Sequence, residues 1–208
     1  DMPNSDKHAE WEPPSGKDHQ EIERSFASEA QYKIEFEAIY KANKNHPSII
    51  AWVPFNEGWG QFKTIEITQW IKQIDTTRLV DGPSGGNFFP VGDIRDFHHY
   101  AEPAIPEKDS ERVMALSEFG GLGLPIKGHT LLQENNWGYK NLTSQKELTS
   151  QYLAFVEKLK LLSREGLSAA FYTQLSDVEN EVNGILTYDR QVIKFDVEKL
   201  RAAHEKLY

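Results

Sequence analysis

The sequence predicts an α/β fold built on a parallel β-sheet, and three observations lead to this prediction. Short apolar segments alternate along the chain with longer amphipathic segments, the pattern of strands connected by helices. The central apolar segment, residues 49–53, lies between Pro47 and a glycine-rich turn, as expected for a strand buried on both faces. Chemically unusual residues follow directly after the apolar segments. In a parallel sheet such residues gather at one edge.

Composition describes a globular protein and argues against two classes of partner. The 208 residues are 38% hydrophobic, enough for a sizeable core. The net charge of −9, without a basic stripe, argues against nucleic acid, and no apolar run approaches the ~20 residues that cross a bilayer. The lack of cysteine excludes a disulfide framework and leaves the compartment open.

The first half of the chain predicts two helices on either side of the central strand. Asp18 and Glu21 have the spacing of a capping box, so we expect a helix from there to about Asn43. Apolar residues at helical spacing define its expected buried face: Ile22, Phe26, Ala30, Ile34 and Ala38. The second helix, over residues 62–74, has an inner stripe of Ile67, Trp70, Ile71 and Ile74.

The rest of the chain predicts four further strands and two helices. We expect the strands at residues 78–81, 94–100, 112–118 and 168–175. Ser144 and Glu147 have capping-box spacing before a helix that ends near Gly166, and the final helix covers about 197–206. Residues 119–142 are expected to form a long loop, and loops of this length in a compact domain are usually functional or disordered.

The number of strands indicates part of a barrel. A closed (β/α)8 barrel needs eight strands and ~250 residues, whereas five strands are expected here. We therefore predict one domain over residues 1–208, an incomplete TIM-type barrel containing about strands four to eight. Asp1–Asn4 resemble the end of an element, so the first three strands would precede them. The outer strands would expose backbone edges, which a homo-oligomer, the N-terminal segment or a local rearrangement would cover.

Two glutamates carry the functional prediction. Glu57 and Glu118 each come at the end of an apolar strand and precede glycines. Paired carboxylates across a barrel rim suit glycoside hydrolysis, in which one protonates the leaving oxygen and the other attacks the sugar or activates water. The competing interpretation is that both are ion-pair partners of nearby Arg or Lys. Their strand-end position favours the catalytic interpretation.

Two motifs resemble those of glycoside hydrolase family 2, the β-galactosidase, β-glucuronidase and β-mannosidase group. They are SIIAWVPFNEGWGQ and MALSEFGG, and the resemblance continues through DFHHYAEP and YTQLSDVENEVNG. It implies the C-terminal part of a catalytic TIM barrel, with strands one to three and any N-terminal β-sandwich domains outside these residues. It also implies a retaining double-displacement mechanism on terminal, non-reducing β-linked sugars, most like a β-galactosidase, without a cofactor.

The resemblance assigns roles by position. Glu57 looks like the general acid/base and Glu118 like the nucleophile, with Tyr100 donating a hydrogen bond to the nucleophile. Asn56 is expected to bond the sugar 2-hydroxyl. The alternatives are a turn-capping amide for Asn56 and a buried structural tyrosine for Tyr100. Many family members place a tryptophan where this chain has Gln174, which changes a pocket wall from apolar to hydrogen-bonding.

Other rim residues are candidates for contacts with the sugar. Trp59 and Trp137 offer ring faces to a pyranose, although packing of an exposed loop explains Trp137 equally well. His98 and His99 could bind sugar hydroxyls or a cation, but strand alternation places only one of them on the inner face, and we assign His99 to the substrate. We predict no metal site from two histidines alone. Asp177 and Glu179 form a polar wall or a solvated acidic loop.

Two rival functions stay open beside the glycosidase. A barrel without three strands lacks part of its sugar pocket, so the isolated chain could be an inactive fragment that binds carbohydrate. A metal-dependent hydrolase using His98 or His99 would lose activity with a chelator. For the glycosidase and for the inactive fragment the partner is a carbohydrate. Neither nucleic acid nor a membrane is expected as a partner. The resemblance implies a periplasmic or extracellular location in a bacterium.

Overall fold

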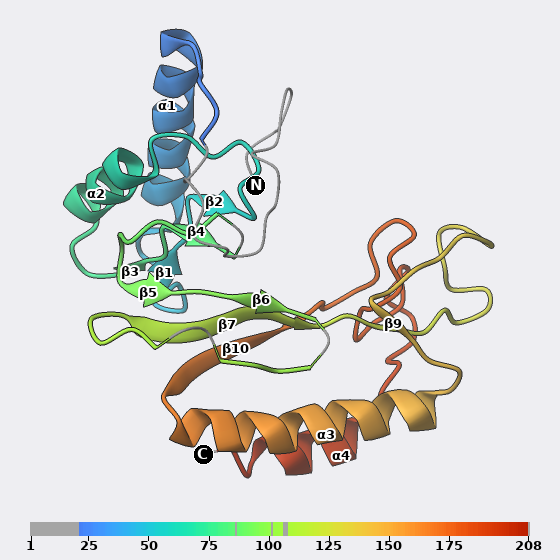
Figure 1. Ribbon diagram of the computed structural model, residues 1–208. Helices are drawn as coiled ribbons and strands as arrows, with labels where there is room; N and C mark the ends of the chain where they lie inside the picture. Colours follow the sequence, from blue (N-terminus) through green and yellow to red (C-terminus); the bar gives the residue numbers. More distant parts are fainter. Residues whose placement is uncertain (1–20, 86, 101, 106–107, 208) are drawn as a thin grey trace. The chain divides into compact units, whose positions relative to one another are not determined.

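The computed structural model describes residues 21–85, 87–100, 102–105 and 108–207. Asp1–Asn4 and Asp18, which carried two of the sequence predictions, lie outside these residues. The chain divides into two compact units, which are described separately (Figure 1). The first comprises Asp1–Asp96 with Asp109–Val113, and the second comprises Phe97–Lys108 with Met114–Tyr208. In neither unit do the described strands close into a barrel.

In the first unit, two segments of the chain, residues 51–56 and 79–84, pair with each other through short parallel strands. Its strands are β1 (Ala51–Trp52), β2 (Phe55–Asn56), β3 (Leu79–Val80), β4 (Pro83–Ser84) and β5 (Ile94–Arg95). β1 pairs with β3, and β2 pairs with β4. The two predicted strands are therefore present, and both continue beyond their expected ends. Because β2 extends the central strand to Asn56, the unusual residues of that segment lie at its carboxyl end.

Helix α1 (Phe26–Asn43) differs from its prediction at its start and on its buried face. It begins after Ser25, whose hydroxyl accepts a hydrogen bond from the Ser28 N–H at 3.3 Å, so the expectation that residues 21–25 are already helical is wrong. Its buried residues are Tyr32 and Phe36, whereas Phe26 is 87% exposed. The aromatic rings of β1, β2 and α2 pack against these two rings. Large rings remove more apolar area from water than the expected Ile and Ala stripe.

Helix α2 (Thr64–Ile74) forms as its periodicity predicts. Ile67 and Ile71 are fully buried, and Trp70 and Ile74 pack beside them. Glu21 belongs to this helix rather than to α1, because its carboxylate accepts hydrogen bonds from the Thr64 N–H at 2.5 Å and the Thr64 hydroxyl at 2.6 Å. A carboxylate at a helix N-terminus satisfies a free N–H and complements the helix dipole.

The second unit is organised around β7 (Val113–Gly120), which enters it at Met114. β6 (His98–His99) and β10 (Leu167–Thr173) both pair with β7 in parallel. The predicted strand 94–100 is thus present as two short strands, β5 and β6. The expected loop 119–142 contains a further parallel pair, β8 (Leu122–Gly123) with β9 (Lys140–Asn141).

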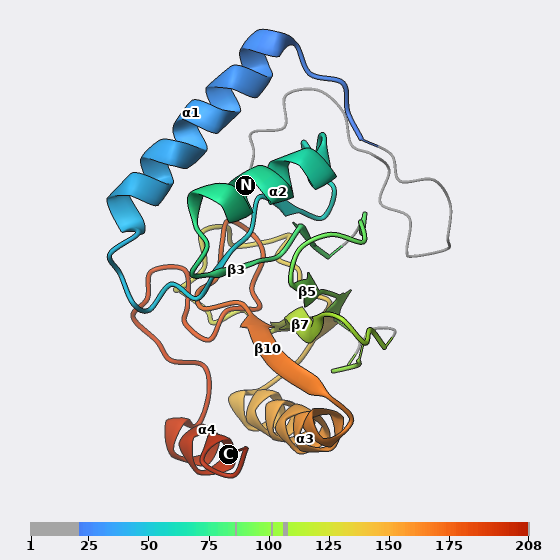
Figure 2. The same ribbon diagram turned by 90° about the vertical axis from the view of Figure 1, so that its left-hand side faces the viewer.

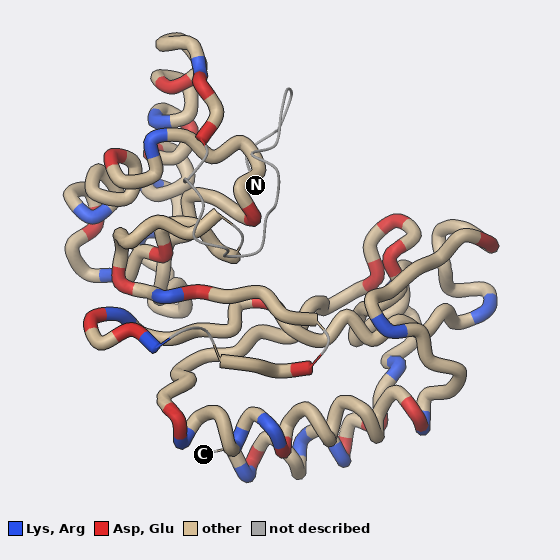
Figure 3. The backbone as a smooth tube through the Cα atoms, viewed as in Figure 1, with Lys and Arg blue, Asp and Glu red and all other residues tan. Residues whose placement is uncertain are grey.

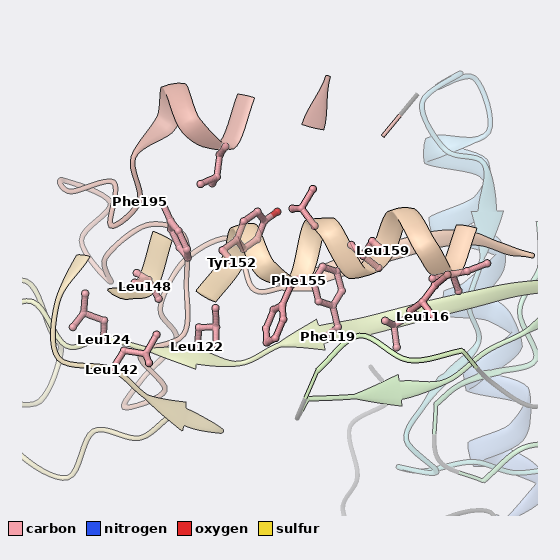
Figure 4. Close-up of a cluster of buried hydrophobic side chains, with 14 residues drawn as sticks. Leu116, Phe119, Leu122, Leu124, Leu142, Leu148, Tyr152, Phe155, Leu159 and Phe195 are labelled. Carbon is pink, nitrogen blue, oxygen red and sulfur yellow. The ribbon is translucent and has the colours of Figure 1, made fainter. Parts of the chain in front are cut away.

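Two helices lie side by side in the second unit, α3 (Gln145–Arg164) and α4 (Val197–His204) (Figure 2). Ser144 caps α3 by accepting from the Glu147 N–H at 3.2 Å, as its spacing predicts. The buried cluster of Figure 4 joins α3 to β7, with the Phe119 ring meeting the Phe155 ring edge-on at 6.3 Å. Acidic and basic residues are interspersed along both helices (Figure 3). None of the described helices has the length and apolarity that a membrane crossing requires.

Candidate active site

In the first unit, the turn after β2 carries three of the predicted site residues. The Glu57 N–H donates to the Ser84 carbonyl at 2.8 Å, which fastens the turn to the end of β4, and the Trp59 N–H donates to the Asn56 carbonyl at 2.9 Å. Glu57 has a φ of 52°, which is uncommon for a residue other than glycine and is found preferentially at functional sites. Asn56 and Glu57 are half-buried, and Trp59 is 40% exposed. The turn therefore presents an amide, a carboxyl and an indole together.

In the second unit, Glu118 lies opposite His98 in the β6–β7 pairing. The Tyr100 hydroxyl donates to Glu118 Oε2, and His98 Nδ1 lies 3.5 Å from the same oxygen. The side chain of His98 is 2% exposed and that of Glu118 is 23% exposed. The arrangement orients one carboxylate.

The chemistry of Tyr100 makes it a lasting hydrogen-bond donor. Burial raises the pKa of the Tyr100 phenol, and the hydrogen bond to Glu118 raises this pKa further. The phenol therefore keeps its proton throughout the neutral range. Donors directed at a carboxylate favour its ionised form, which is the form that a nucleophile needs.

The two histidines have different surroundings. His98 is the one beside Glu118, whereas His99 Nδ1 lies 2.5 Å from the Glu102 carbonyl, and its ring stacks on Phe97 at 5.5 Å. Alternation correctly predicts that the two side chains diverge. Assigning His99 to the substrate stays a prediction. The proximity of His98 to Glu118 depends on the register of β6 against β7, which no local pattern reveals.

A chain of aromatic rings continues from Tyr100. The Tyr100 and Tyr139 rings are stacked with their centroids 3.7 Å apart and their planes within 2°, and Trp137 meets Tyr139 edge-on at 5.4 Å. Trp137 is 40% exposed and Tyr139 is 52% exposed. Sequence reasoning assigned no role to Tyr139. Its only signal there was membership of a loop rich in glycine and aromatic residues.

Gln174 follows β10 and is held by its neighbours. Its side-chain amide donates to Asn183 Oδ1 at 2.9 Å, and the Asn183 amide donates to Glu181 Oε1 at 2.7 Å. This relay fixes the orientation of Gln174 at the end of the strand. A polar residue at this position is therefore integrated into the fold, and its role as a hydrogen-bonding wall of a sugar pocket stays a prediction.

Asp177 takes part in a buried ion pair. Its Oδ1 accepts from Lys194 Nζ at 2.7 Å, and both side chains are almost completely buried. Lys194 also donates to the carbonyls of Val182 at 2.8 Å and Leu124 at 3.2 Å. Burial raises the pKa of Asp177 and lowers the pKa of Lys194, and the ion pair opposes both shifts. Asp177 thus belongs to a structural clamp, whereas Glu179 is exposed.

A second buried carboxyl group lies in the first unit. Asp81 and Asp96 are 4% and 5% exposed and are hydrogen-bonded to each other, and Asp96 Oδ2 accepts from the Gly85 N–H at 3.1 Å. Burial, and then the neighbouring Asp96, raise the pKa of Asp81 well above its usual range. Two carboxyls in a hydrogen bond share a proton, so Asp81 acts as the donor.

Comparison with known proteins identifies the family. No curated protein matches the chain significantly. The family model described as "Glycosyl hydrolases family 2, TIM barrel domain" matches residues 15–206. This range includes Glu57, Glu118 and all the other candidate site residues described above. The resemblance noted in the sequence is thereby confirmed, and the chain belongs to glycosyl hydrolase family 2.

Proposed function

We infer that this chain is the catalytic barrel portion, about strands four to eight, of a retaining glycoside hydrolase. It would remove terminal, non-reducing β-linked sugars, with a β-galactosidase-like specificity, by double displacement using two glutamates. Family membership supports glycoside hydrolysis in general. The observation that carries the specific proposal is the carboxylate of Glu118, which accepts a hydrogen bond from the Tyr100 hydroxyl at one oxygen, with His98 Nδ1 3.5 Å from the same oxygen.

Glu118 has the properties that a nucleophile requires. The Tyr100 hydroxyl donates to one oxygen of its carboxylate and favours the ionised form. The same contact restricts the rotation of the carboxylate about its terminal bond. A carboxylate that is ionised and oriented before the substrate arrives needs little reorganisation during the reaction.

Glu57 is proposed as the acid/base. The turn after β2 holds it half-buried, with its backbone tied to β4 through the Ser84 carbonyl. In the first step the Glu118 carboxylate attacks the anomeric carbon while the C–O bond breaks and the leaving oxygen takes the proton of Glu57. In the second step Glu57 removes a proton from water, which attacks the same carbon and releases Glu118. This mechanism requires the two carboxyls to lie roughly 5–5.5 Å apart.

The two glutamates need different protonation states at the start of the reaction. The mechanism requires Glu118 to be ionised and Glu57 to carry a proton when the substrate binds. The negative charge of Glu118 disappears when Glu118 forms the glycosyl ester. Glu57, which has given its proton to the leaving oxygen, is then the base of the second step.

Substrate recognition is proposed for the surrounding residues. Asn56 would bond the 2-hydroxyl, where a hydrogen bond strengthens in the transition state. The exposed indoles of Trp59 and Trp137 would stack on sugar rings. Gln174, oriented by Asn183, would bond a sugar hydroxyl. The alternative proposal, an inactive fragment that binds carbohydrate, predicts sugar binding without turnover.

The decisive experiment replaces Glu118 in the purified protein. Turnover is measured on aryl β-galactosides, glucuronides, mannosides and arabinosides, and Glu118→Gln should lower kcat by about 10³-fold or more. Glu165→Gln removes the same charge from an exposed position beyond α3 and should leave kcat unchanged. A 2-deoxy-2-fluoro aryl glycoside should leave its sugar attached to the peptide that contains Glu118. Retention of most of the activity by Glu118→Gln would refute the proposal.

A further inference from the structure

The stacked rings of Tyr100 and Tyr139 pack against Gly121. The rings are nearly parallel, with their centroids 3.7 Å apart. Gly121, which follows β7, has a φ of 59°. A Cβ atom at this position would lie 2.6 Å from Tyr139 Cδ2 and 2.9 Å from Tyr100 Cδ1. Both rings therefore occupy space that any larger residue at position 121 would take, and the left-handed backbone there also favours glycine.

The backbone around Tyr139 is held on both sides. The Lys140 N–H donates to the Gly121 carbonyl at 3.1 Å, within the β8–β9 pairing. Before Tyr139, the Trp137 N–H donates to the Asn180 carbonyl at 2.9 Å, and the Trp137 carbonyl accepts from the Val182 N–H at 2.8 Å. The Tyr139 ring is thus presented to Tyr100 from a fixed segment, although it is 52% exposed.

Tyr100 connects this stacked pair to Glu118 through its hydroxyl group. The hydroxyl of Tyr100 reaches Glu118 Oε2 only while the Tyr100 ring keeps its orientation. Two side-chain torsions, χ1 and χ2, set the position of the Tyr100 ring, and a parallel partner ring restricts both of them. Loss of the partner would let the Tyr100 ring turn away, so the hydrogen bond to the carboxylate would be populated for less of the time.

We propose that Tyr139 is a positioning residue that acts through Tyr100 on the carboxylate of Glu118. This inference rests on the proposed function, in which Glu118 is the nucleophile. Tyr139 needs no contact with the reacting atoms in this role. Its contribution comes from its ring face, and its hydroxyl group is not required.

The kinetic test compares two substitutions at the same position. Tyr139→Ala should lower kcat on an aryl β-glycoside by about 10- to 100-fold, the range expected for losing a hydrogen bond to a charged group. KM should change much less. The acidic limb of the pH profile of kcat/KM should move to higher pH, because Glu118 loses a donor that favours its ionised form. Tyr139→Phe keeps the ring and should restore most of the activity.

A double-mutant cycle separates positioning from direct contact with the sugar. Tyr100→Phe should show the same loss as Tyr139→Ala, and combining the two should add little, because Tyr139 acts only through the Tyr100 hydroxyl. Tyr188→Ala removes a similarly exposed tyrosine elsewhere in the second unit and serves as the control. Tyr139→Leu, which keeps apolar volume, repeats the test if the alanine variant does not fold. Independently of activity, Tyr139→Ala and Tyr100→Ala should lower Tm by less together than the sum of their separate effects.

The outcomes distinguish this inference from the proposed function. If Tyr100→Phe lowers kcat while Tyr139→Ala changes neither kcat nor the pH profile, the positioning role is wrong and the glycosidase proposal stands. Fully additive losses, or a Tyr139→Phe variant as impaired as Tyr139→Ala, would also overturn the positioning role. If Glu118→Gln retains its activity, the proposed function itself fails.

Discussion

Replacing Lys194 by methionine tests the clamp that holds the loop after β10. Lys194 is 0% exposed, and its ammonium group donates to Asp177 Oδ1 and to the carbonyls of Val182 and Leu124. Methionine fills most of the volume but leaves a buried carboxyl and two carbonyls without this donor. Removing one partner of a buried ion pair costs about 3–5 kcal/mol, because the other charge stays buried and uncompensated.

The assay is the free energy of unfolding from urea titration, accompanied by Tm. For a chain of this size each kcal/mol corresponds to about 2–4 °C, so the Tm of Lys194→Met should fall by about 6–20 °C. Lys199→Met is the matched control. Lys199 pairs with Asp196 at the surface, where its side chain is 65% exposed, and such a pair contributes about 0–1 kcal/mol.

The double variant provides the sharpest check of the reasoning. Adding Asp177→Asn to Lys194→Met removes the uncompensated charge, so the double variant should be more stable than Lys194→Met alone. Hydrogen exchange at the Gly184 N–H, which donates to Asp177 Oδ1 at 2.8 Å, reports the same loop directly. A loss below about 1 kcal/mol for Lys194→Met would show that the clamp does not stabilise the fold as argued.

Two further predictions concern the first unit. The folded-state pKa of Asp81 is raised, so its stabilisation is complete below the unfolded pKa of about 4 and is lost as the pH rises through the folded pKa. Asp81→Asn should therefore flatten the pH dependence of the free energy of unfolding above about pH 4. The control Glu23→Gln, at an exposed site, should leave this pH dependence unchanged. Parallel curves for Asp81→Asn and the wild type would contradict the prediction. Glu21→Ala removes the acceptor at the start of α2 and should lower the free energy of unfolding by about 0.5–2 kcal/mol in urea titration, with Glu23→Ala as control. Equal stabilities of these two alanine variants would exclude a capping role for Glu21.

Local features of this protein could be predicted because neighbouring residues cause them. The hydroxyl of Ser144 and the N–H of Glu147 lie one helical turn apart, so the cap of α3 follows from spacing alone. Ile67 and Ile71 lie on one side of α2 for the same reason, and both are buried. The positions of Glu57 and Glu118 near strand ends also follow from the apolar segments before them. Their catalytic roles stay predictions.

Other features depend on residues that are distant in the chain. α1 carries apolar residues on more than one side, and the rings of Phe55 and Trp52 decide that Tyr32 and Phe36 are the buried ones. Strand register decides that His98, rather than His99, lies beside Glu118. A single-residue shift in register would exchange the faces of a strand, and no local pattern records it.

By itself, the sequence determined the family, the succession of strands and helices, and the location of Glu57 directly after a strand; Glu118 was expected at the end of its strand, but β7 continues to Gly120. These depend on periodicity, on caps and on motifs, all of which extend over a few neighbouring residues. Only the tertiary structure decided the stacking of Tyr139 on Tyr100 and the burial of Lys194 against Asp177. Such contacts exist because folding brings remote side chains together and excludes water between them. Polar interactions are stronger in that environment than in water.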